Sequence, residues 1–232
     1  MEKISKMKFK FNKIYYSLFK ERFDKSINFN FPQDINRWDL ISEIIKIKKF
    51  NSYLEIGCDD DYSFKKRDVP EKIGVDPYSG GNFKGTSDQF FTQNNRKFDC
   101  IFIDGLHEYD QVCKDLENSL NCISEKGIIF LHDALPANVH QQAVPRYKVI
   151  WNGDVWKSIV NYRTRNDCDI VTCKIDHGVS VVQKITNKKP LKNVSISDFK
   201  ELSFKNFYEN HKEYMRIMDY KEVINYISKT SD

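Results

Sequence analysis

The sequence predicts an α/β protein built on a mostly parallel, doubly wound Rossmann-like sheet. Four short segments are apolar at consecutive positions, which is typical of strands covered on both faces. These segments are 52–57, 72–76, 98–104 and 127–133. Polar or helical stretches separate them, and strands that alternate with helices favour right-handed βαβ units. Two later runs, 169–175 and 179–185, are joined by too few residues for a crossover helix, so we expect an antiparallel hairpin there.

Helices are expected on both sides of this region. Residues 35–47 place isoleucine and leucine near one side of a helix, and residues 109–123 repeat apolar side chains at helical spacing. Gly127 is expected to close the turn after that second helix. The tail from Val194 is expected to form one or two helices packed outside the sheet.

Length and composition restrict the class of protein. A chain of 232 residues with 40% hydrophobic and 30% charged residues is an ordinary globular protein with one real core. We expect three parts: a helical extension over 1–34, one domain over 35–190, and C-terminal helices over 191–232 packed on that domain. No apolar run approaches the roughly 20 residues of a membrane-spanning helix, and lysines interrupt the N-terminus. We therefore expect a cytoplasmic protein.

Charge and cysteine content indicate little by themselves. The net charge is +4, and six cysteines lie without CxxC spacing, so we expect reduced, mostly buried thiols. Lysines cluster in the first twenty residues, at Lys3, Lys6, Lys8, Lys10, Lys13 and Lys20. They could touch a polyanion or a membrane surface, although a solvated helix face is the commoner meaning of such a run.

The ends of the first two strands predict a nucleoside site. In open parallel sheets a ligand binds beyond the carboxyl ends of the strands. Glu55 and Gly57 end the first strand, where a glycine allows a ligand close to the backbone, and Asp76 ends the second. Asp76 lies 21 residues after Glu55, and an acid at that spacing, at the end of the second strand, typically accepts hydrogen bonds from ribose hydroxyls. A tight strand-to-helix turn is the plainer explanation of Glu55 and Gly57 alone.

The same segment argues against a dinucleotide. "EIGCDDD" lacks the G-x-G-x-x-G pattern, and its three aspartates would repel a pyrophosphate. A nucleoside that carries a positive charge fits better, and this description matches S-adenosylmethionine, a sulfonium.

The chain resembles a class I S-adenosylmethionine-dependent methyltransferase, and within that superfamily it is similar to the family-24-type enzymes associated with methylation of surface polysaccharides and natural-product sugars. The resemblance runs from about Asn36 to Lys184. Its segments are "NRWDLI", "YLEIGC", "IGVDP", "TSDQFF", "FDCIFIDGLHEYDQVCKDLENSL", "GIIFLHDALP" and "WNGDVWKSI". It implies the sheet order 3-2-1-4-5-7-6 with an antiparallel seventh strand.

The resemblance also implies roles for residues around the cofactor. Glu55 and Gly57 would bind its methionine side, Asp76 its ribose, and Ser87 and Asp88 would lie near its adenine. One departure is Asp61, which stands where the common first motif has a further glycine.

Asp104 and Asp133 end the fourth and fifth strands. Neighbouring strands lie about 4.8 Å apart, so the two carboxylates can converge on one hard cation. In the O-methyltransferases that the chain resembles, acids at these positions hold Mg²⁺, which binds the acceptor hydroxyls. The position after the second acid is often another oxygen ligand, and here it is Ala134. The alternative is that Asp104 contacts the cofactor and Asp133 caps the following segment.

His107 follows Asp104 by three residues. A histidine can accept a proton near neutral pH, as methylation of an alcohol requires, and related sugar methyltransferases use a histidine at this spacing as general base. We expect His107 and Asp104 to be catalytic. His132 is expected to point away and pack, although it could line the pocket. Further candidates for the acceptor site lie in the irregular segment 136–157: Gln141, Arg146, Trp151, Asp154 and Trp156. Anchoring a helix to the sheet explains Trp156 equally well.

The predicted function is methyl transfer from S-adenosylmethionine to a hydroxyl of a sugar or related small molecule, with or without Mg²⁺. The acceptor could be a nucleotide-sugar or glycan, and the chain could form a homo-oligomer. A nucleic-acid methyltransferase that uses the basic N-terminus is less well supported, because the fourth strand ends in "IDGLH" and not in an Asn/Asp-Pro-Pro-aromatic motif. A catalytically inactive cofactor-binding subunit is the third alternative.

Overall fold

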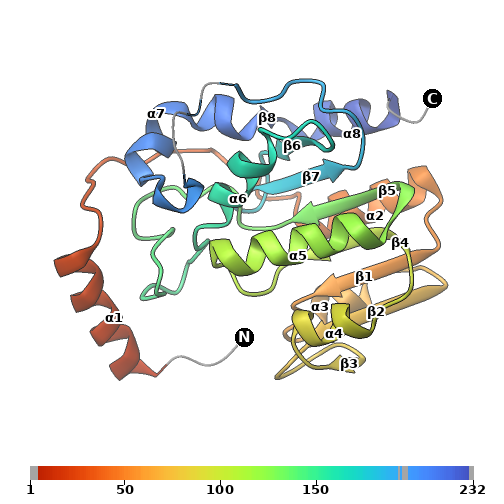
Figure 1. Ribbon diagram of the computed structural model, residues 1–232, viewed down its shortest axis with the longest axis horizontal. Coiled ribbons are helices and arrows are strands. Elements are labelled where there is room, and N and C mark those ends of the chain that lie inside the picture. The colour runs from red at the N-terminus through yellow and green to blue at the C-terminus, as the bar shows by residue number, and fades with distance from the viewer. Residues whose placement is uncertain (1–4, 193, 195–197, 230–232) are drawn as a thin grey trace.

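The computed structural model describes residues 5–192, 194 and 198–229, and within them one eight-stranded sheet runs through the molecule (Figure 1). The strand order is β3-β2-β1-β4-β5-β7-β6-β8. β1 to β5 pair in parallel, and β7 is antiparallel to both of its neighbours. The predicted sheet order and the predicted hairpin are therefore confirmed.

The described helices and strands follow each other as α1 (Lys6–Phe19), α2 (Arg37–Lys48), β1 (Ser52–Ile56), α3 (Tyr62–Lys65), β2 (Glu71–Asp76), β3 (Phe83–Lys84), α4 (Ser87–Gln93), β4 (Phe98–Ile103), α5 (Tyr109–Cys122), β5 (Ile123–Leu131), α6 (Val155–Tyr162), β6 (Asp169–Cys173), β7 (Val179–Gln183), a 3₁₀ turn (Phe199–Glu201), α7 (Phe204–Met215), β8 (Ile217–Met218) and α8 (Tyr220–Lys229).

Helices cover both faces of the sheet, as the unbroken apolar strands require. On one face α4, α5, α6 and α7 pack on side chains such as Leu54, Ile101 and Ile129. On the other face α2, α3 and α8 pack on side chains that alternate with these, such as Tyr53 and Phe102. Each central strand thus contributes to two hydrophobic clusters, which makes the carboxyl edge of the sheet a rigid base for a site.

Two structural expectations drawn from the sequence were wrong. The tail does not lie only outside the sheet, because Ile217 and Met218 form β8 and pair in parallel with β6. Gly127 does not close a turn, because α5 ends at Cys122 and Gly127 lies within β5. A Cβ on Gly127 would come within 2.8 Å of the Asp99 carbonyl oxygen, beside the irregular register between β4 and β5. Glycine is therefore required there by close approach of the backbone.

Two isoleucines of α2 test how much the second layer stabilises the fold. Ile44 is 1% exposed, whereas Ile47, one turn along the same helix, is 42% exposed. We expect Ile44→Ala to lower the free energy of unfolding by about 2–5 kcal/mol, because it leaves a cavity between α2 and the sheet. Ile47→Ala should cost no more than about 1 kcal/mol. Urea unfolding of both variants measures the difference, and equal losses would contradict the described packing.

Candidate active site

A pocket of about 870 Å³ opens at the carboxyl edge of the sheet. It lies where ligands bind in open α/β sheets and falls within the size range of small-molecule sites. The ends of β1, β2, β4 and β5 form its floor, and it is surrounded by the β6–β7 turn, by parts of α1, α2, α4 and α5, and by the segment 146–151. Its polar lining includes Lys8, Arg37, Glu55, Asp76, Ser87, Asp88, Asp104, His107, Gln111, Asp115, His132, Asp133, Arg146, Asp176 and His177.

Contacts within the protein fix the conformation of the turn after β1. Gly57 has φ +89°, and a Cβ there would lie 2.3 Å from the Asp104 carbonyl oxygen. Glycine is therefore required because the end of β4 approaches closely, which supports the plainer explanation of this residue. Asp61, at the departure from the common motif, adopts the left-handed conformation with φ +67°, and its Oδ1 accepts a hydrogen bond from the Gly81 N–H. That bond holds the aspartate in a conformation that favours glycine.

Asp76, at the end of β2, connects the turn after β1 with the turn after β2. Its carboxylate accepts hydrogen bonds from the backbone N–H groups of Asp59, Tyr78 and Ser79 at 2.8–3.0 Å. Burial alone would raise the pKa of Asp76, but these three bonds outweigh it and lower the pKa below its usual value. The side chain is thus a fixed anion at the end of β2 that can accept a further hydrogen bond.

Near the start of α4 the pocket is lined by a second group of polar side chains. Its members are Ser87, Asp88, Gln111 and Asp115, of which only the first two were predicted from the sequence. Ser87 and Asp88 begin α4, and both accept hydrogen bonds from the Gln111 side-chain amide. The same amide also donates to Asp115, whose buried carboxyl has its pKa raised to about 6 by burial. Gln111 and Asp115 lie four residues apart on α5, so one face of that helix carries both, but only the fold places α5 beside α4.

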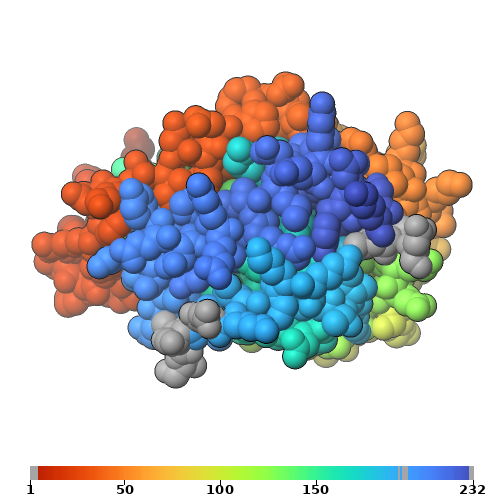
Figure 2. Space-filling view, turned by 90° about the horizontal axis from the view of Figure 1, so that it is seen from above, coloured from red at the N-terminus to blue at the C-terminus, as the bar shows by residue number. Residues whose placement is uncertain are grey.

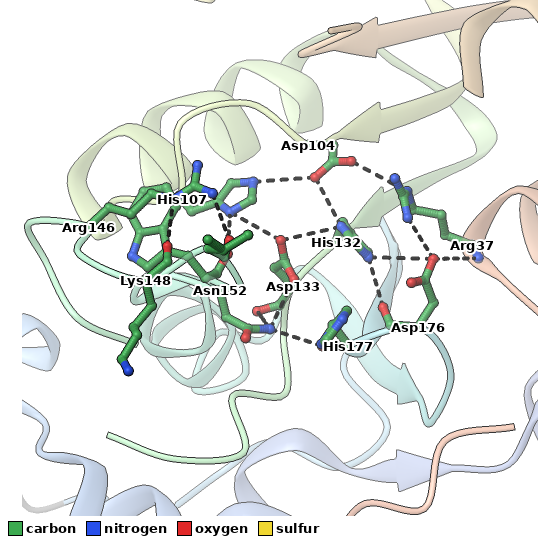
Figure 3. Close-up of polar contacts among 12 residues, drawn as sticks. Arg37, Asp104, His107, His132, Asp133, Arg146, Lys148, Asn152, Asp176 and His177 are labelled. Atoms are coloured by element: carbon green, nitrogen blue, oxygen red, sulfur yellow. Dashed lines mark hydrogen bonds and ion pairs between the residues drawn. The ribbon is translucent and has the colours of Figure 1, made fainter. Parts of the chain in front are cut away.

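Three carboxylates meet in the middle of the pocket (Figure 3). Asp104 Oδ1 lies 3.3 Å from His107 Nε2 and 3.0 Å from His132 Nδ1, and its Oδ2 lies 3.4 Å from Arg37 Nε. Burial alone would raise the pKa of Asp104, but the two histidines and Arg37 lower it well below its usual range. Asp104 is therefore an anion throughout the physiological pH range.

His132 does not point away from the pocket, so that expectation was wrong. Its Nδ1 contacts Asp104 at 3.0 Å, and its Nε2 contacts the Asp176 carbonyl oxygen at 2.8 Å. Both partners are acceptors, so the ring donates to both only when both nitrogens carry protons. Burial would lower the pKa of His132, but Asp133 and Asp104 raise it well above its usual value. The ring turns inward because the end of β4 and the β6–β7 turn present these oxygens to it.

Asp133 and Asp176 complete the group of carboxylates. Asp133 Oδ2 lies 3.2 Å from His107 Nδ1, and Asp176 Oδ2 accepts a hydrogen bond from Arg37 Nη1 at 2.7 Å. Both residues have positive φ, at 59° and 41°, which is rare for a side chain that is not glycine. Such strain is retained only where surrounding contacts hold it, and it often marks a functional site.

The segment Trp151–Asp154 holds His107 in place. The Trp151 ring stacks on the imidazole with centroids 5.2 Å apart and 17° between planes, and the Arg146 guanidinium also lies over the indole, 5.3 Å from its centroid. The Asp154 N–H donates to the His107 carbonyl oxygen, and a Cβ on Gly153 would lie 1.8 Å from that same oxygen. Asn152 donates from its side chain to Asp133. The segment therefore positions both His107 and Asp133.

The expected acceptor residues divide into two groups. His132, Arg146 and Trp151 line the pocket, but Gln141, Asp154 and Trp156 do not. Trp156 is fully buried, donates to Gln142 and packs on Phe207, so it anchors α6. The Asp154 carboxylate accepts from the Tyr109 N–H at the start of α5, and Gln141 Oε1 accepts from the Ala137 N–H. These three side chains satisfy backbone groups or fill the core, which corrects their assignment to the acceptor.

Sequence reasoning missed Arg37 and Asp176. Asp176 had a usable signal: β6 is parallel to β5, so the turn after β6 must emerge at the same edge of the sheet. Arg37 lies in the "NRWDLI" segment, before β1, and nothing in the local pattern distinguishes it from a solvated arginine. Only the packing of α2 brings it to Asp104 and Asp176.

Asp104, His107 and Asp133 could hold a metal ion. Each offers one ligand atom, and these atoms all lie within 4.8 Å of one another. Two carboxylate oxygens suit a hard cation, and a nitrogen of the neutral His107 ring can add a third ligand, whereas the nearby Arg37 guanidinium has donors only and cannot bind a metal. Ala134 is fully buried in the core, so its position adds no ligand. The donor set thus fits a divalent cation that retains other ligands of its own.

Comparisons with known proteins point to one class of enzyme. Residues 66–134 match the model of a family described as a methyltransferase domain. No curated protein sequence matches the chain. The chain is similar in structure to the methyltransferase PaMTH1 of Podospora anserina bound to SAH, with 18% identity, 64% of this chain and 77% of that chain covered, and a TM-score of 0.52.

Two bacterial structures are also similar. One is a provisionally named O-methyltransferase from Klebsiella pneumoniae, with 13% identity, 75% and 96% coverage and a TM-score of 0.51. The other is a provisionally named caffeoyl-CoA O-methyltransferase from Staphylococcus aureus, with 14% identity, 76% and 91% coverage and a TM-score of 0.50. At these identities the structures establish the fold. The family match over residues 66–134 agrees with the resemblance to a methyltransferase that the sequence motifs indicate.

Glu55 gives the site a measurable pH dependence. The side chain is 1% exposed and accepts a 2.5 Å hydrogen bond from the Tyr53 hydroxyl, and burial raises its pKa to about 7. Between pH 4.5 and 7 the native state binds more protons than the unfolded state, so stability falls as pH rises through this window. We expect the wild type to lose on the order of 2 kcal/mol more than Glu55→Gln between pH 5 and pH 8. Urea unfolding without cofactor measures this, and parallel pH profiles would contradict the raised pKa.

Proposed function

We propose that this chain, an S-adenosylmethionine-dependent methyltransferase of class I fold, transfers the methyl group to a hydroxyl oxygen of a small molecule. One observation carries the proposal. Arg37 and protonated His132 offset two of the three negative charges of Asp104, Asp133 and Asp176. The third is offset when His107 gains a proton or when a cation binds. Either event is what deprotonation of an alcohol requires.

The cofactor would occupy the part of the pocket between β1 and α4. Glu55 and the turn at Gly57 would hold its methionine side, Asp76 would accept from the ribose hydroxyls, and Ser87 and Asp88 would lie near the adenine. Asp104, at the end of β4, would lie between cofactor and acceptor. When bound, S-adenosylmethionine supplies an electrophilic methyl group on a sulfonium, which these acidic surroundings favour.

His107 is the proposed general base. In the neutral ring with its proton on Nδ1, which lies 3.2 Å from Asp133 Oδ2 and 3.4 Å from the Trp151 carbonyl oxygen, Nε2 is the atom that accepts the hydroxyl proton. Nε2 lies 3.3 Å from Asp104 Oδ1, which would accept a hydrogen bond from the imidazolium once it has formed. Burial would lower the pKa of His107, but Asp133 and Asp104 raise it above its usual value, so the imidazolium that forms is stabilised. Stacking on Trp151 limits rotation of the ring and thereby aids positioning of the acceptor.

A divalent cation such as Mg²⁺ would be held by Asp104 and Asp133. When bound, it supplies Lewis-acid chemistry that lowers the pKa of a hydroxyl. His107 completes the three-residue group, but it serves as base only when it does not coordinate the metal. The carboxylates are therefore the proposed ligands.

We propose a polyhydroxylated acceptor, a sugar, nucleotide-sugar or glycan of surface-polysaccharide or natural-product biosynthesis. Trp151 and Arg146 line the pocket beside the carboxylates, with the Arg146 guanidinium over the indole ring. Adjacent hydroxyls on a sugar suit a site with both a carboxylate pair and a base. An inactive cofactor-binding subunit would have no need of the paired strain at Asp133 and Asp176.

Substitution of the base tests the proposal. We expect His107→Ala to bind S-adenosylhomocysteine about as tightly as the wild type but to lose about 10²–10⁴-fold in methyl transfer to a panel of nucleotide-sugars and glycans. His211→Ala, on α7 away from the pocket, is the matched control and should keep its activity. Isothermal calorimetry and transfer of labelled methyl measure the two quantities. Undiminished transfer by His107→Ala rules out the base, and failure of the wild type to bind the cofactor product rules out the class of reaction.

Chelation tests the cation separately. We expect EDTA to abolish transfer by the wild type and Mg²⁺ to restore it, and we expect Asp133→Asn to raise the Mg²⁺ concentration for half-maximal activity at least about tenfold, because a neutral amide is a weaker ligand. Asp176→Asn, which removes a neighbouring charge outside the three-residue group, should leave that concentration within about threefold. Full activity in EDTA would exclude the metal and leave His107 as the only proton acceptor proposed.

A further inference from the structure

α1 presents a stripe of apolar side chains to solvent. At about 100° per residue, Met7, Phe11, Ile14 and Leu18 fall on one narrow arc of the helix. They are 70%, 69%, 57% and 63% exposed. Tyr15 and Phe19 beside them are also exposed. Scattered apolar side chains on a surface are normal, but a continuous stripe of this kind marks an interaction surface.

The stripe lies opposite the face by which α1 packs on the protein. Tyr16 is buried and donates from its hydroxyl to the Val139 carbonyl oxygen at 3.2 Å, while Asn12 donates to the Arg146 carbonyl oxygen at 2.7 Å. Phe9 packs against the core on this same side. α1 is thus held by one apolar face and carries a second one that the described chain does not cover. Figure 2 shows the N-terminal residues, in red, at one end of the molecule.

The charges around the stripe all have one sign. Lys6, Lys10 and Lys13 follow one flank of α1, Lys8 lies on the other, and residues 6–20 contain no acid. The next acid, Glu21, accepts hydrogen bonds from the Phe204 and Lys205 N–H groups at the start of α7, so its charge is engaged away from the stripe. The stripe therefore lies in a basic surface.

We infer that α1 docks this protein on a bilayer containing anionic lipid, with the helix lying in the plane of the interface. An apolar stripe flanked by lysines is the pattern that inserts shallowly among headgroups while its cations contact lipid phosphates. Pairing of α1 with α1 of a second copy would bring like charges together. A nucleic acid would engage the lysines and leave the stripe in water. Within the described residues no helix is long and apolar enough to cross a membrane, so the contact is peripheral.

The docked surface continues to the mouth of the pocket. Lys8 of α1 lines the pocket, and so do Val149 and Ile150, which are 78% and 55% exposed. The loop that carries them is tied to α1 through Asn12 and Arg146. Docking of α1 would bring the pocket to the membrane surface, where a glycan on a lipid carrier presents its hydroxyls. This consequence, unlike the docking, depends on the proposed methyl transfer.

Vesicle sedimentation with the full chain tests the docking. We expect the wild type to bind vesicles of phosphatidylcholine and phosphatidylglycerol at least about tenfold more tightly than phosphatidylcholine alone, and added salt to weaken binding. Phe11→Ser/Ile14→Ser/Leu18→Ser and Lys6→Glu/Lys10→Glu/Lys13→Glu should each lose at least about tenfold in affinity. The matched control is Lys46→Glu/Lys126→Glu/Lys221→Glu, which makes the same change of net charge on exposed positions of α2, β5 and α8. It should keep most of the binding.

Other outcomes would overturn the inference. If the lysine variant alone loses binding and the wild type binds duplex DNA, α1 is a polyanion site. If light scattering shows a dimer that the serine variant dissociates, and no vesicles bind, the stripe joins two copies. S-adenosylhomocysteine calorimetry on every variant verifies the fold and tests the proposed function independently, because none of these substitutions lies in the proposed catalytic or cofactor site.

Discussion

Three buried or half-buried carboxylates surround His132 at the carboxyl edge of the sheet, and the rest of the site depends on how their charges are offset. Asp104, Asp133 and Asp176 come from three different segments, and each would be costly to bury alone. Arg37 and His132 supply fixed positive charge, and His107 supplies a proton site that can be occupied or empty. His107 can therefore change its charge while the residues around it keep theirs, as a proton acceptor requires.

The backbone around this group is as specialised as its side chains. Gly57 and Gly153 are required because carbonyl oxygens of Asp104 and His107 pass too close for any Cβ. Asp133, Asp176 and His177 adopt positive φ, and the Ala134 and Leu135 N–H groups bond to the β6–β7 turn that carries the last two. The end of β5 and that turn thus fix each other. These strained backbone conformations are stable because they are anchored to rigid, fully buried strands.

Charge is distributed unevenly between the inside and the outside of the pocket. The floor is acidic, which suits a sulfonium and a divalent cation, whereas α1 at the rim carries lysines and no acid. The small net charge of +4 conceals this separation. An acidic interior and a basic rim would let one molecule hold the proposed cationic cofactor while it approaches an anionic surface or acceptor.

The sequence by itself determined six strands of the sheet, the hairpin and the residues that end those strands, because strand period and strand ends are local properties of the chain, but it did not reveal β8. It placed Glu55, Asp76, Asp104, His107 and Asp133 at one edge, and the structure brings them into one pocket. Only the tertiary structure decided which side chains meet. Arg37, Asp176 and Asp115 reach the pocket through helix packing and a turn distant in sequence, His132 turns inward because its two partners lie on separate elements, and Trp156 turns into the core. Long-range packing fixes these orientations, and no local pattern encodes them.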